Sequence, residues 1–441
     1  MKIKNKSYRL LPAILFGGVT GIITALTVTL YKISANYVIS FSEKGYHFIK
    51  DKLWIIPIVL GVLYLIALLY DWVYKKEPEI SGGGIPTSIG IINEKISFGW
   101  LKTLVGTFTL SIVSFFIGVP LGNEGPSVLM GTAIGKGVHS PFYKKYDSYK
   151  KYSMTGGACA GFSVATGAPI SGILFAIEEA HHKISTLIIV VSSFSVLSGF
   201  ITTKILESVL NIDVSLFHYT EFVSLPLRNI WITVLVGIAF GLFSVLFLKC
   251  YGVISALFND KMKKIPRKYK IFAVFVITLM LGLVSESFIS TGHHLILNLF
   301  KNSPSVVMLF IILLIRTTLT LSANTSGITG GVFVPFLALG AVFAAILGGG
   351  ITALFSLGNE YYILILALGI VACISSMMKM PLTAIIFSIE AFSLYNNILS
   401  VLIVSVLSFL ITELLGAESI NDRVLKNKLG VLMENESDEL D

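Results

Sequence analysis

The carboxylate of Glu124 occupies an unusual place in this sequence. It lies in the segment GNEGPSV, residues 122–128, and the nearest charged residues on either side are Lys102 and Lys136. An ionisable side chain within so apolar a stretch is typical of an ion or proton pathway in a membrane protein. A carboxylate that competes with an anion for one position, and leaves it on binding a proton, would couple the two species. The alternative is an acid that caps the outer surface.

Three segments share one pattern, in which glycines are followed by a proline where an apolar helix is expected to begin. They are GGGIP at 82–86, GNEGP at 122–126 and GGVFVP at 330–335. Proline suits the first helical turn, and glycine lets the backbone come close to a bound group. Helices that start inside the membrane in this way would aim free N–H groups and positive dipole ends at a small anion. The alternative is a set of ordinary loops followed by helix starts.

A second acidic cluster, EEAHH, spans Glu178 to His182. Glu178 and His181 have the Glu-x-x-His spacing of di-iron sites in helical bundles, but those sites need a second such pair elsewhere in the bundle, which the chain lacks. We therefore expect no metal site here, and an ordinary acidic helix end is the alternative. The segment GTAIGKG at 131–137 is one residue too short for a phosphate-binding loop and lacks its final hydroxyl. The sequence predicts no cofactor.

The elements that position these residues must lie in a membrane. Of the 441 residues 54% are hydrophobic and 13% charged, with a mean hydropathy of +0.84, whereas soluble proteins carry about 25% charged residues. A spanning helix needs about 20 mostly apolar residues. Apolar runs cover residues 11–32, 53–73, 103–121, 153–177, 229–249, 271–284, 302–315, 332–357, 361–378 and 396–412. The chain is predicted to be an all-α polytopic membrane protein.

Basic residues are clustered and predict the orientation of the chain. The clusters are Lys2, Lys4, Lys6 and Arg9; Lys75 and Lys76; Lys144, Lys145, Lys150 and Lys151; and Lys261, Lys263, Lys264, Arg267, Lys268 and Lys270. Short loops rich in lysine and arginine stay in the cytoplasm, so we expect these loops and both termini inside. Nucleic-acid binding would need a basic face on a soluble module. The sequence contains no such module, so no nucleic-acid partner is expected.

The chain repeats itself. PISGILFAIEEA begins at Pro169 and the similar PLTAIIFSIEAF begins at Pro381, 212 residues later. The glycine–proline segments that end at Pro126 and Pro335 are 209 residues apart. Two motifs in the same order at nearly the same offset indicate a duplicated half of roughly 200 residues.

The two halves are predicted to be inverted. The first half has a basic loop at 144–151 between its two motifs, whereas the corresponding loop near 357–361 has no lysine or arginine. Corresponding loops on opposite faces indicate an inverted repeat, a device of transporters whose sites lie near the midplane. The expected organisation is one transmembrane domain over 1–425, with repeats at about 10–205 and 228–425 and a short cytosolic tail at 426–441. The acidic segment MENESDEL within this tail is expected to be disordered.

The sequence resembles the CLC family of chloride channels and chloride/proton antiporters. GGGIP is similar to its GSGIP motif, GNEGP to G(K/R)EGP and GGVFVP to GxFxP, and the resemblance covers about residues 10–425. It implies half-helices that converge on anion sites, and a homodimer with one pore per subunit. It also implies the simple prokaryotic type, without paired C-terminal regulatory modules.

The resemblance assigns roles to individual residues. Glu124 would be the gating glutamate, and the backbone N–H groups of Val332 and Phe333 would bind the anion. Glu179 would be the internal proton-transfer acid, which the antiporters have and the channels lack. The other predicted anion-binding positions are Gly83, Gly84, Ile85, Gly125 and Asn421.

Three positions depart from the family pattern. Gly83 stands where the family has serine, Asn421 where it has tyrosine, and Asn123 where it has a basic residue. Both usual side-chain ligands of the central anion site are therefore changed. We expect weak central chloride binding and looser coupling to protons.

The predicted function is exchange of chloride, or a similar small anion, for protons across the cell membrane, with the lipid bilayer as surroundings. The alternative is a passive chloride channel of the same fold, gated by voltage or pH. A membrane-embedded hydrolase would need a nucleophile with a base, and no histidine lies near GNEGP in the sequence. We therefore expect the chain not to be an enzyme.

Overall fold

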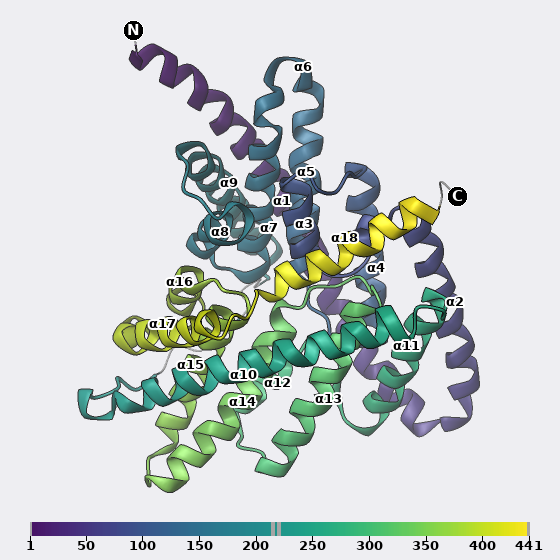
Figure 1. Ribbon diagram of the computed structural model, residues 1–441, viewed down its shortest axis with the longest axis vertical. Coiled ribbons are helices and arrows are strands. Elements are labelled where there is room, and N and C mark those ends of the chain that lie inside the picture. Colours follow the sequence, from purple (N-terminus) through teal and green to yellow (C-terminus); the bar gives the residue numbers. More distant parts are fainter. Residues whose placement is uncertain (1, 213–216, 218–221, 439–441) are drawn as a thin grey trace.

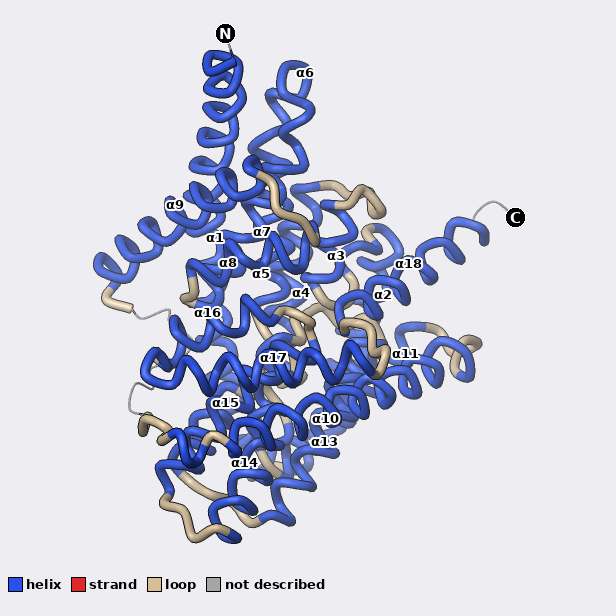
Figure 2. Tube along the Cα trace, turned by 60° about the vertical axis from the view of Figure 1, so that its left-hand side comes forward, coloured by secondary structure: helices blue, strands red, loops and turns tan. Residues whose placement is uncertain are grey.

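The computed structural model describes residues 2–212, 217 and 222–438. Within them the chain forms helices, turns and loops, apart from one antiparallel bridge between Gly122 and Gly331. Figure 2 shows helices throughout, with loops only between them. The predicted all-α class is confirmed.

The first half of the chain runs through helices of very different length. They are α1 (Lys2–Asp51), α2 (Ile56–Lys76), α3 (Gly84–Ile92), α4 (Trp100–Ile117), α5 (Glu124–His139), α6 (Tyr143–Tyr146), α7 (Lys150–Thr166), α8 (Pro169–Phe175) and α9 (Thr186–Leu210). A π-helical turn, Ala176–His181, follows α8 directly.

The second half has a similar mixture of long and short helices. They are α10 (Trp231–Ala256), α11 (Arg267–Val284), α12 (His293–Lys301), α13 (Val306–Thr325), α14 (Phe333–Leu354), α15 (Asn359–Met377), α16 (Pro381–Phe392), α17 (Ile398–Leu414) and α18 (Ile420–Asp438). Helix α18 continues through residue 426, where the sequence predicts a tail to begin.

Nine helices in the described part of the chain are long and apolar enough to cross a membrane. The predicted run at 153–177 is instead two helices. Helix α7 ends at Thr166, Gly167 follows with a φ of 73°, and α8 starts at Pro169. Glycine adopts this left-handed backbone readily, and proline suits the first turn of a new helix. The chain is a polytopic membrane protein with broken helices.

The helices of the two halves form two adjoining groups (Figure 1). Helices α5, α7, α8 and α9 lie together near α1, whereas α10, α13, α14, α15 and α17 form the other group, and Figure 2 shows the same division. Helix α18 returns from the second group to contact α3. The last helix therefore contacts an early part of the chain.

Helices α5 and α7 pack closely through glycines. A Cβ atom on Gly131 would lie 2.0 Å from the carbonyl oxygen of Gly157, and one on Gly157 would lie 1.9 Å from the carbonyl oxygen of Gly131. Small residues let membrane helices approach to backbone contact. This packing fixes α5, the helix that begins at Glu124.

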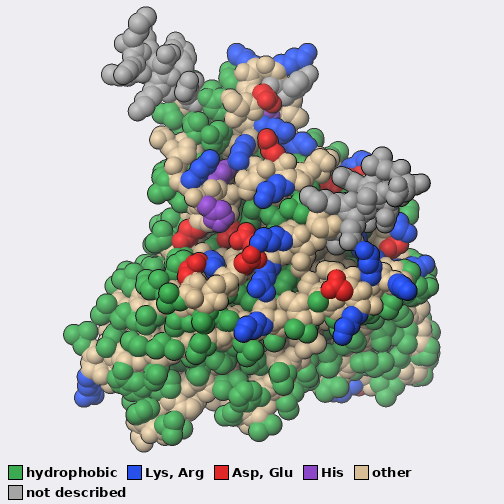
Figure 3. Space-filling model, viewed as in Figure 1, with side chains coloured by type: hydrophobic (Ala, Val, Ile, Leu, Met, Phe, Trp, Pro, Cys, Tyr) green, Lys and Arg blue, Asp and Glu red, His purple; other side chains and the backbone are tan. Residues whose placement is uncertain are grey.

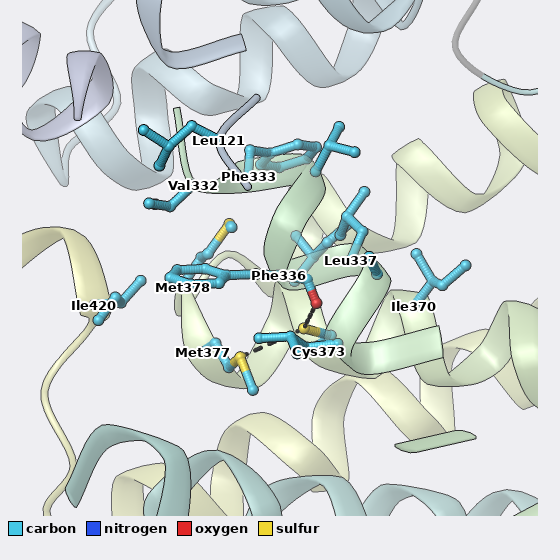
Figure 4. Close-up of a cluster of buried hydrophobic side chains, with 14 of the residues drawn as sticks. Leu121, Val332, Phe333, Phe336, Leu337, Ile370, Cys373, Met377, Met378 and Ile420 are labelled. Carbon is cyan, nitrogen blue, oxygen red and sulfur yellow. Dashed lines mark hydrogen bonds between the residues drawn. The ribbon is translucent and has the colours of Figure 1, made fainter. Parts of the chain in front are cut away.

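Helix α14 packs on α15 through a hydrophobic core. Figure 4 shows Phe336 and Leu337 of α14 facing α15. The Cys373 thiol donates to the carbonyl oxygen of Phe336 at 3.2 Å and contacts the sulfur of Met377 at 3.5 Å. The start of α14 is therefore embedded among packed apolar side chains.

The starts of helices α8 and α16 are each capped by a carboxylate from the other helix or its continuation. Glu390, near the end of α16, accepts hydrogen bonds from the N–H groups of Ile170 and Ser171 and from the Ser171 hydroxyl, at 2.7–2.9 Å. Glu178, just after α8, accepts from the N–H groups of Leu382 and Thr383 and from the Thr383 hydroxyl, at 2.6–2.8 Å. Positions 178 and 390 are 212 residues apart, as are 171 and 383. Such an exchange is what an inverted duplication would produce.

Charged side chains gather on one part of the surface. In Figure 3 lysines and arginines, with some acids among them, lie around α6 and below it, whereas the opposite end of this face is mainly hydrophobic. The first turns of α1 project on the same side as α6 in both Figure 1 and Figure 2. The basic loop 144–151 and the start of the chain are thus on one side, as the charge pattern predicts.

Candidate anion and proton site

The starts of α3, α5 and α14 have the same register. Each helix has proline as its third residue, at Pro86, Pro126 and Pro335. The first N–H groups of a helix have no partner within the helix, so proline loses no bond there. The N–H groups of the two residues before each proline have no partner within the helix, so they can bind another acceptor.

Backbone contacts bring these three starts together. Gly122 and Gly331 exchange N–H···O bonds of 2.6 and 2.7 Å. A Cβ on Gly84 would lie 2.0 Å from the carbonyl oxygen of Gly125, and one on Gly125 would lie 2.7 Å from the Cα of Gly331. Only glycine fits at these contacts. Three motifs that are far apart in the sequence therefore meet at one point.

Glu124 is the first residue of α5 and is only 1% exposed. Its carboxylate lies against the backbone N–H groups of Glu124 itself and of Val334, the second residue of α14. Its Oε2 atom has no hydrogen-bond partner among the described residues. The carboxylate thus reaches the start of α14 with only part of its bonding capacity used.

The predicted anion-binding residues Val332 and Phe333 are the N-cap and first residue of α14. The Phe333 ring is fully buried and packs edge-on against Phe162 and Phe387, with centroids 5.3 and 5.9 Å apart. Figure 4 shows Val332 and Phe333 beside Leu121, which precedes α5. An ion at these N–H groups would be screened little, because the surroundings are apolar.

Gly83 and Ile85 flank the first residue of α3. Gly83 is the N-cap residue and its carbonyl oxygen accepts a 3.0 Å hydrogen bond from the Thr87 hydroxyl. Ile85 is the second residue of the helix and its side chain is buried. Both residues belong to the glycine-rich segment that meets Gly125.

Glu179 lies in the π-helical turn after α8 and is 3% exposed. Its Oε1 atom accepts a 2.8 Å hydrogen bond from the amide nitrogen of Asn421, in the first turn of α18. The structure therefore directs the Asn421 amide to Glu179. Whether Asn421 also binds an anion stays a prediction.

Glu179 also lines a hollow of about 560 Å³. Charged side chains around this hollow include Lys379, Glu413, Asp422 and Lys426. A polar hollow of this kind would give protons access to a buried acid. Glu178, by contrast, is held at the start of α16, and His181 pairs with the Thr155 hydroxyl at 2.8 Å.

A buried cation acts on Glu124 from another helix. Lys32 of α1 is 5% exposed, and its charge interacts electrostatically with the Glu124 carboxylate. Its amine donates hydrogen bonds to the carbonyl oxygens of Val164 and Ala165, at the end of α7. A helix C-terminus carries partial negative charge and favours a cation. A positive charge is therefore present although Asn123 carries none.

Comparison with known proteins agrees with this geometry. Residues 65–413 match the voltage-gated chloride channel family. The chain belongs to the CLC family. The H(+)/Cl(-) exchange transporter ClcA of Vibrio campbellii is 28% identical over 421 residues, which cover 93% of this chain and 88% of that protein. ClcA of Vibrio parahaemolyticus is 27% identical over 424 residues, or 94% and 90% of the two chains.

Solved structures show the same CLC fold. The crystal structure of a slow cyanobacterial Cl-/H+ antiporter has a TM-score of 0.85 at 24% identity, covering 95% of this chain and 98% of that one. A CLC-type fluoride/proton antiporter has a TM-score of 0.73 at 19% identity, with coverage of 92% and 96%. The expected CLC-like fold is confirmed.

Several residues of this CLC protein were missed by sequence reasoning. Val334 could have been found, because the second residue of a helix always has a free N–H. Lys32 lies at the end of the predicted run 11–32, where it looked like the edge of a span, but α1 continues to Asp51. One sequence feature could have indicated the reciprocal capping by Glu178 and Glu390. The two residues occupy equivalent positions under the 212-residue offset.

Proposed function

We propose that this CLC protein is a secondary antiporter that exchanges chloride, or a similar small anion, for protons across the cell membrane. The observation that carries the proposal is the position of Glu124, whose carboxylate lies against an N–H group at the start of α14. The names of the curated relatives, both exchangers of H+ and Cl-, agree with it. The chain is a transporter in this proposal and has no enzymatic reaction.

Glu124 acts as a tethered substitute for the anion. When ionised, its carboxylate fills the position at the start of α14, where N–H groups and the helix dipole favour negative charge. Protonation removes that charge, so the side chain loses its attraction and leaves. The N–H group of Val334, next to those of Val332 and Phe333, is then open to chloride. Because the proton and the anion use the same carboxylate position in turn, their movements are coupled.

Glu179 receives protons from the cytosolic side. The hollow beside it supplies access, and the Asn421 amide holds the carboxylate in one orientation. A fixed acid at this position can take up a proton and pass it on without moving far. Chloride does not bind Glu179, so chloride and protons follow separate routes on this side of the protein.

A liposome experiment separates exchange from passive conduction. Purified protein in liposomes is given a chloride gradient with no proton gradient, and the internal pH is followed. Proton movement against its own gradient supports the antiporter. Chloride flux without it would establish the passive channel, and fluoride is tested in parallel because one structural neighbour carries that ion.

The remaining parts of the proposal concern assembly and orientation. The protein is a homodimer with one pore per subunit, as the family resemblance implies, and both termini lie in the cytoplasm. Exposed apolar side chains of α9 and α17, such as Leu197, Ile201, Leu399 and Leu402, suit a partner surface or lipid. Mass measurement in detergent tests the dimer. Labelling of single cysteines in intact cells, placed in the loop 144–151, tests the orientation.

A further inference from the structure

We propose that the side-chain amide of Asn324 is an anion ligand at the central site, in the place left by the missing hydroxyl at Gly83. This inference rests on the proposed function, since it assigns one more contact to the transported anion. Asn324 lies in the last turn of α13, far in sequence from the segment 82–86. No motif of the sequence analysis pointed to it.

The amide nitrogen of Asn324 lies where a side chain at Gly83 would begin. A Cβ atom built on Gly83 would be 3.4 Å from Asn324 Nδ2, and no other protein atom would be closer to it outside the adjacent backbone. Gly83 is the N-cap residue of α3, one of the helix starts that meet at the site. A serine there would place its hydroxyl beside the position that this amide now occupies.

Backbone pairing fixes this arrangement. The N–H of Gly327 donates to the carbonyl oxygen of Asn324 at 3.1 Å, and the N–H of Gly82 donates to the carbonyl oxygen of Gly327 at 2.9 Å. The N–H of Gly330 closes the loop on the carbonyl oxygen of Gly82 at 3.4 Å. The end of α13 and the loop that follows it are thus tied to Gly82, the residue before Gly83. The position of the amide is set by the fold.

The Asn324 amide has bonding capacity to spare. The residue is only 6% exposed, and its Nδ2 atom has no hydrogen-bond partner among the described residues. An amide nitrogen carries two donors, and buried donors in native proteins nearly always find an acceptor. An anion beside the start of α3 would be such an acceptor. A negatively charged ligand suits this site better than a neutral one, because free helix N–H groups surround it.

The other altered position does not fill the same role. The amide nitrogen of Asn421 already donates to Glu179 at 2.8 Å. Gly83 lacks a side chain and the Asn421 amide is engaged, whereas the Asn324 amide can still donate beside the start of α3. The weak central binding expected from positions 83 and 421 is therefore offset by a ligand from a third position.

Chloride titration of the purified protein tests this assignment, with calorimetry as the measurement. Asn324→Leu keeps a similar volume without donors and should weaken chloride binding about 10-fold or more, the effect of losing one hydrogen bond to a charged partner. Asn324→Asp puts an oxygen in place of the donor and should weaken binding further. Adding Gly83→Ser to Asn324→Leu supplies a hydroxyl at the same point, and should restore most of the affinity.

Asn427→Leu is the matched control, because that amide already donates to the hydroxyls of Tyr251 and Ser255. It should leave chloride affinity unchanged. Thermal unfolding checks that each variant is folded. If Asn324→Leu does not fold, the chloride affinity of Asn324→Asp tests the assignment instead. Wild-type affinity in a folded Asn324 variant would overturn the inference while the exchange function stands. A wild type that neither binds chloride nor exchanges it for protons would overturn both.

Discussion

Carboxylates bind at two kinds of helix N-terminus in this protein, and the two kinds differ in how many hydrogen bonds each carboxylate accepts. At the starts of α8 and α16, Glu390 and Glu178 each use both oxygens and accept three hydrogen bonds. At the start of α14, Glu124 lies against backbone N–H groups while its Oε2 atom has no partner in the described part of the chain. The helix dipole attracts the carboxylate at both places. Only at the starts of α8 and α16 do both carboxylate oxygens have hydrogen-bond partners.

The difference separates a structural cap from an exchangeable one. A hydrogen bond to a charged partner contributes about 1.5–3 kcal/mol, so three such bonds hold a side chain firmly. Glu178 and Glu390 also come from the opposite repeat, so each joins the two halves. Glu124 belongs to the cluster of starts that it closes and has fewer bonds to lose. In the proposed exchange a small anion replaces Glu124, whereas Glu178 and Glu390 stay in place.

The largest effect is expected from closing the space between the converging helix starts. A Cβ on Gly84 would lie 2.0 Å from the carbonyl oxygen of Gly125, a backbone atom that cannot move aside. Gly84→Ala should therefore lower the free energy of unfolding by more than the roughly 1–3 kcal/mol typical of an overpacked core, and should yield little folded protein. Gly83→Ala is the matched control, since its nearest neighbour would be at 3.4 Å. Equal thermal stability of the two variants would contradict the close contact.

Complete loss of proton coupling is expected from Glu124→Gln. The amide imitates the protonated acid, so anion flux should continue while chloride gradients no longer drive protons. Glu390→Gln is the control, because it alters a saturated cap outside the anion position. It should lower stability by about 1.5–3 kcal/mol and keep the ratio of protons to chloride. Uphill proton transport by Glu124→Gln at wild-type efficiency would show that Glu124 is not the exchangeable cap.

A smaller, selective effect is expected at the neighbouring pair Glu178 and Glu179. Glu179→Gln should slow proton transport while chloride flux survives, because the acid is the proposed proton entry. Glu178→Gln should act on thermal stability and leave the proton-to-chloride ratio as it is. Both fluxes are measured in the same liposomes. If Glu179→Gln keeps the wild-type ratio, Glu179 is an ordinary helix-end acid.

Local backbone signals made the helix starts predictable. Glycine and proline restrict or free the backbone at their own positions, so GGGIP, GNEGP and GGVFVP predict where α3, α5 and α14 begin, and the structure has these starts. The convergence of the three followed from the inverted repeat and the family resemblance. The sequence therefore indicated most of the fold and the helix starts of the site.

Side-chain directions were not predictable in the same way. The bond from Asn421 to Glu179 depends on how α18 packs against the turn after α8, and the position of Asn324 depends on a loop that pairs with Gly82. Lys32 acts on Glu124 from the middle of α1. The hydropathy pattern does not reveal this position, because the predicted apolar run ends at residue 32. Such contacts are set by tertiary packing between distant segments, which composition and spacing do not encode.

The smallest effect on transport is expected from Lys428, which holds α18 to the segment before α3. In its ammonium form the side chain donates, at 2.7 Å each, to the carbonyl oxygens of Glu79 and Ser81 and to the Thr87 hydroxyl. Burial lowers the pKa of Lys428 to about 7, from its ordinary 10.5. In the folded protein the amine therefore loses its proton at a lower pH than in the unfolded chain. Lys428 thus favours folding above pH 10.5, and this contribution is lost as the pH falls towards 7.

Replacing Lys428 by methionine isolates that contribution, because methionine keeps the apolar stem and has no titrating group. Between pH 7 and 10 the wild type should gain stability relative to Lys428→Met, with a slope of at most about 1.4 kcal/mol per pH unit. Thermal unfolding of both proteins across this range gives the difference, in which groups common to both cancel. Parallel stability curves would mean that the lysine keeps its proton when buried. Chloride affinity should fall only slightly in the variant, because α18 is also held by Arg423, which donates to the carbonyl oxygen of Leu248 at 2.7 Å.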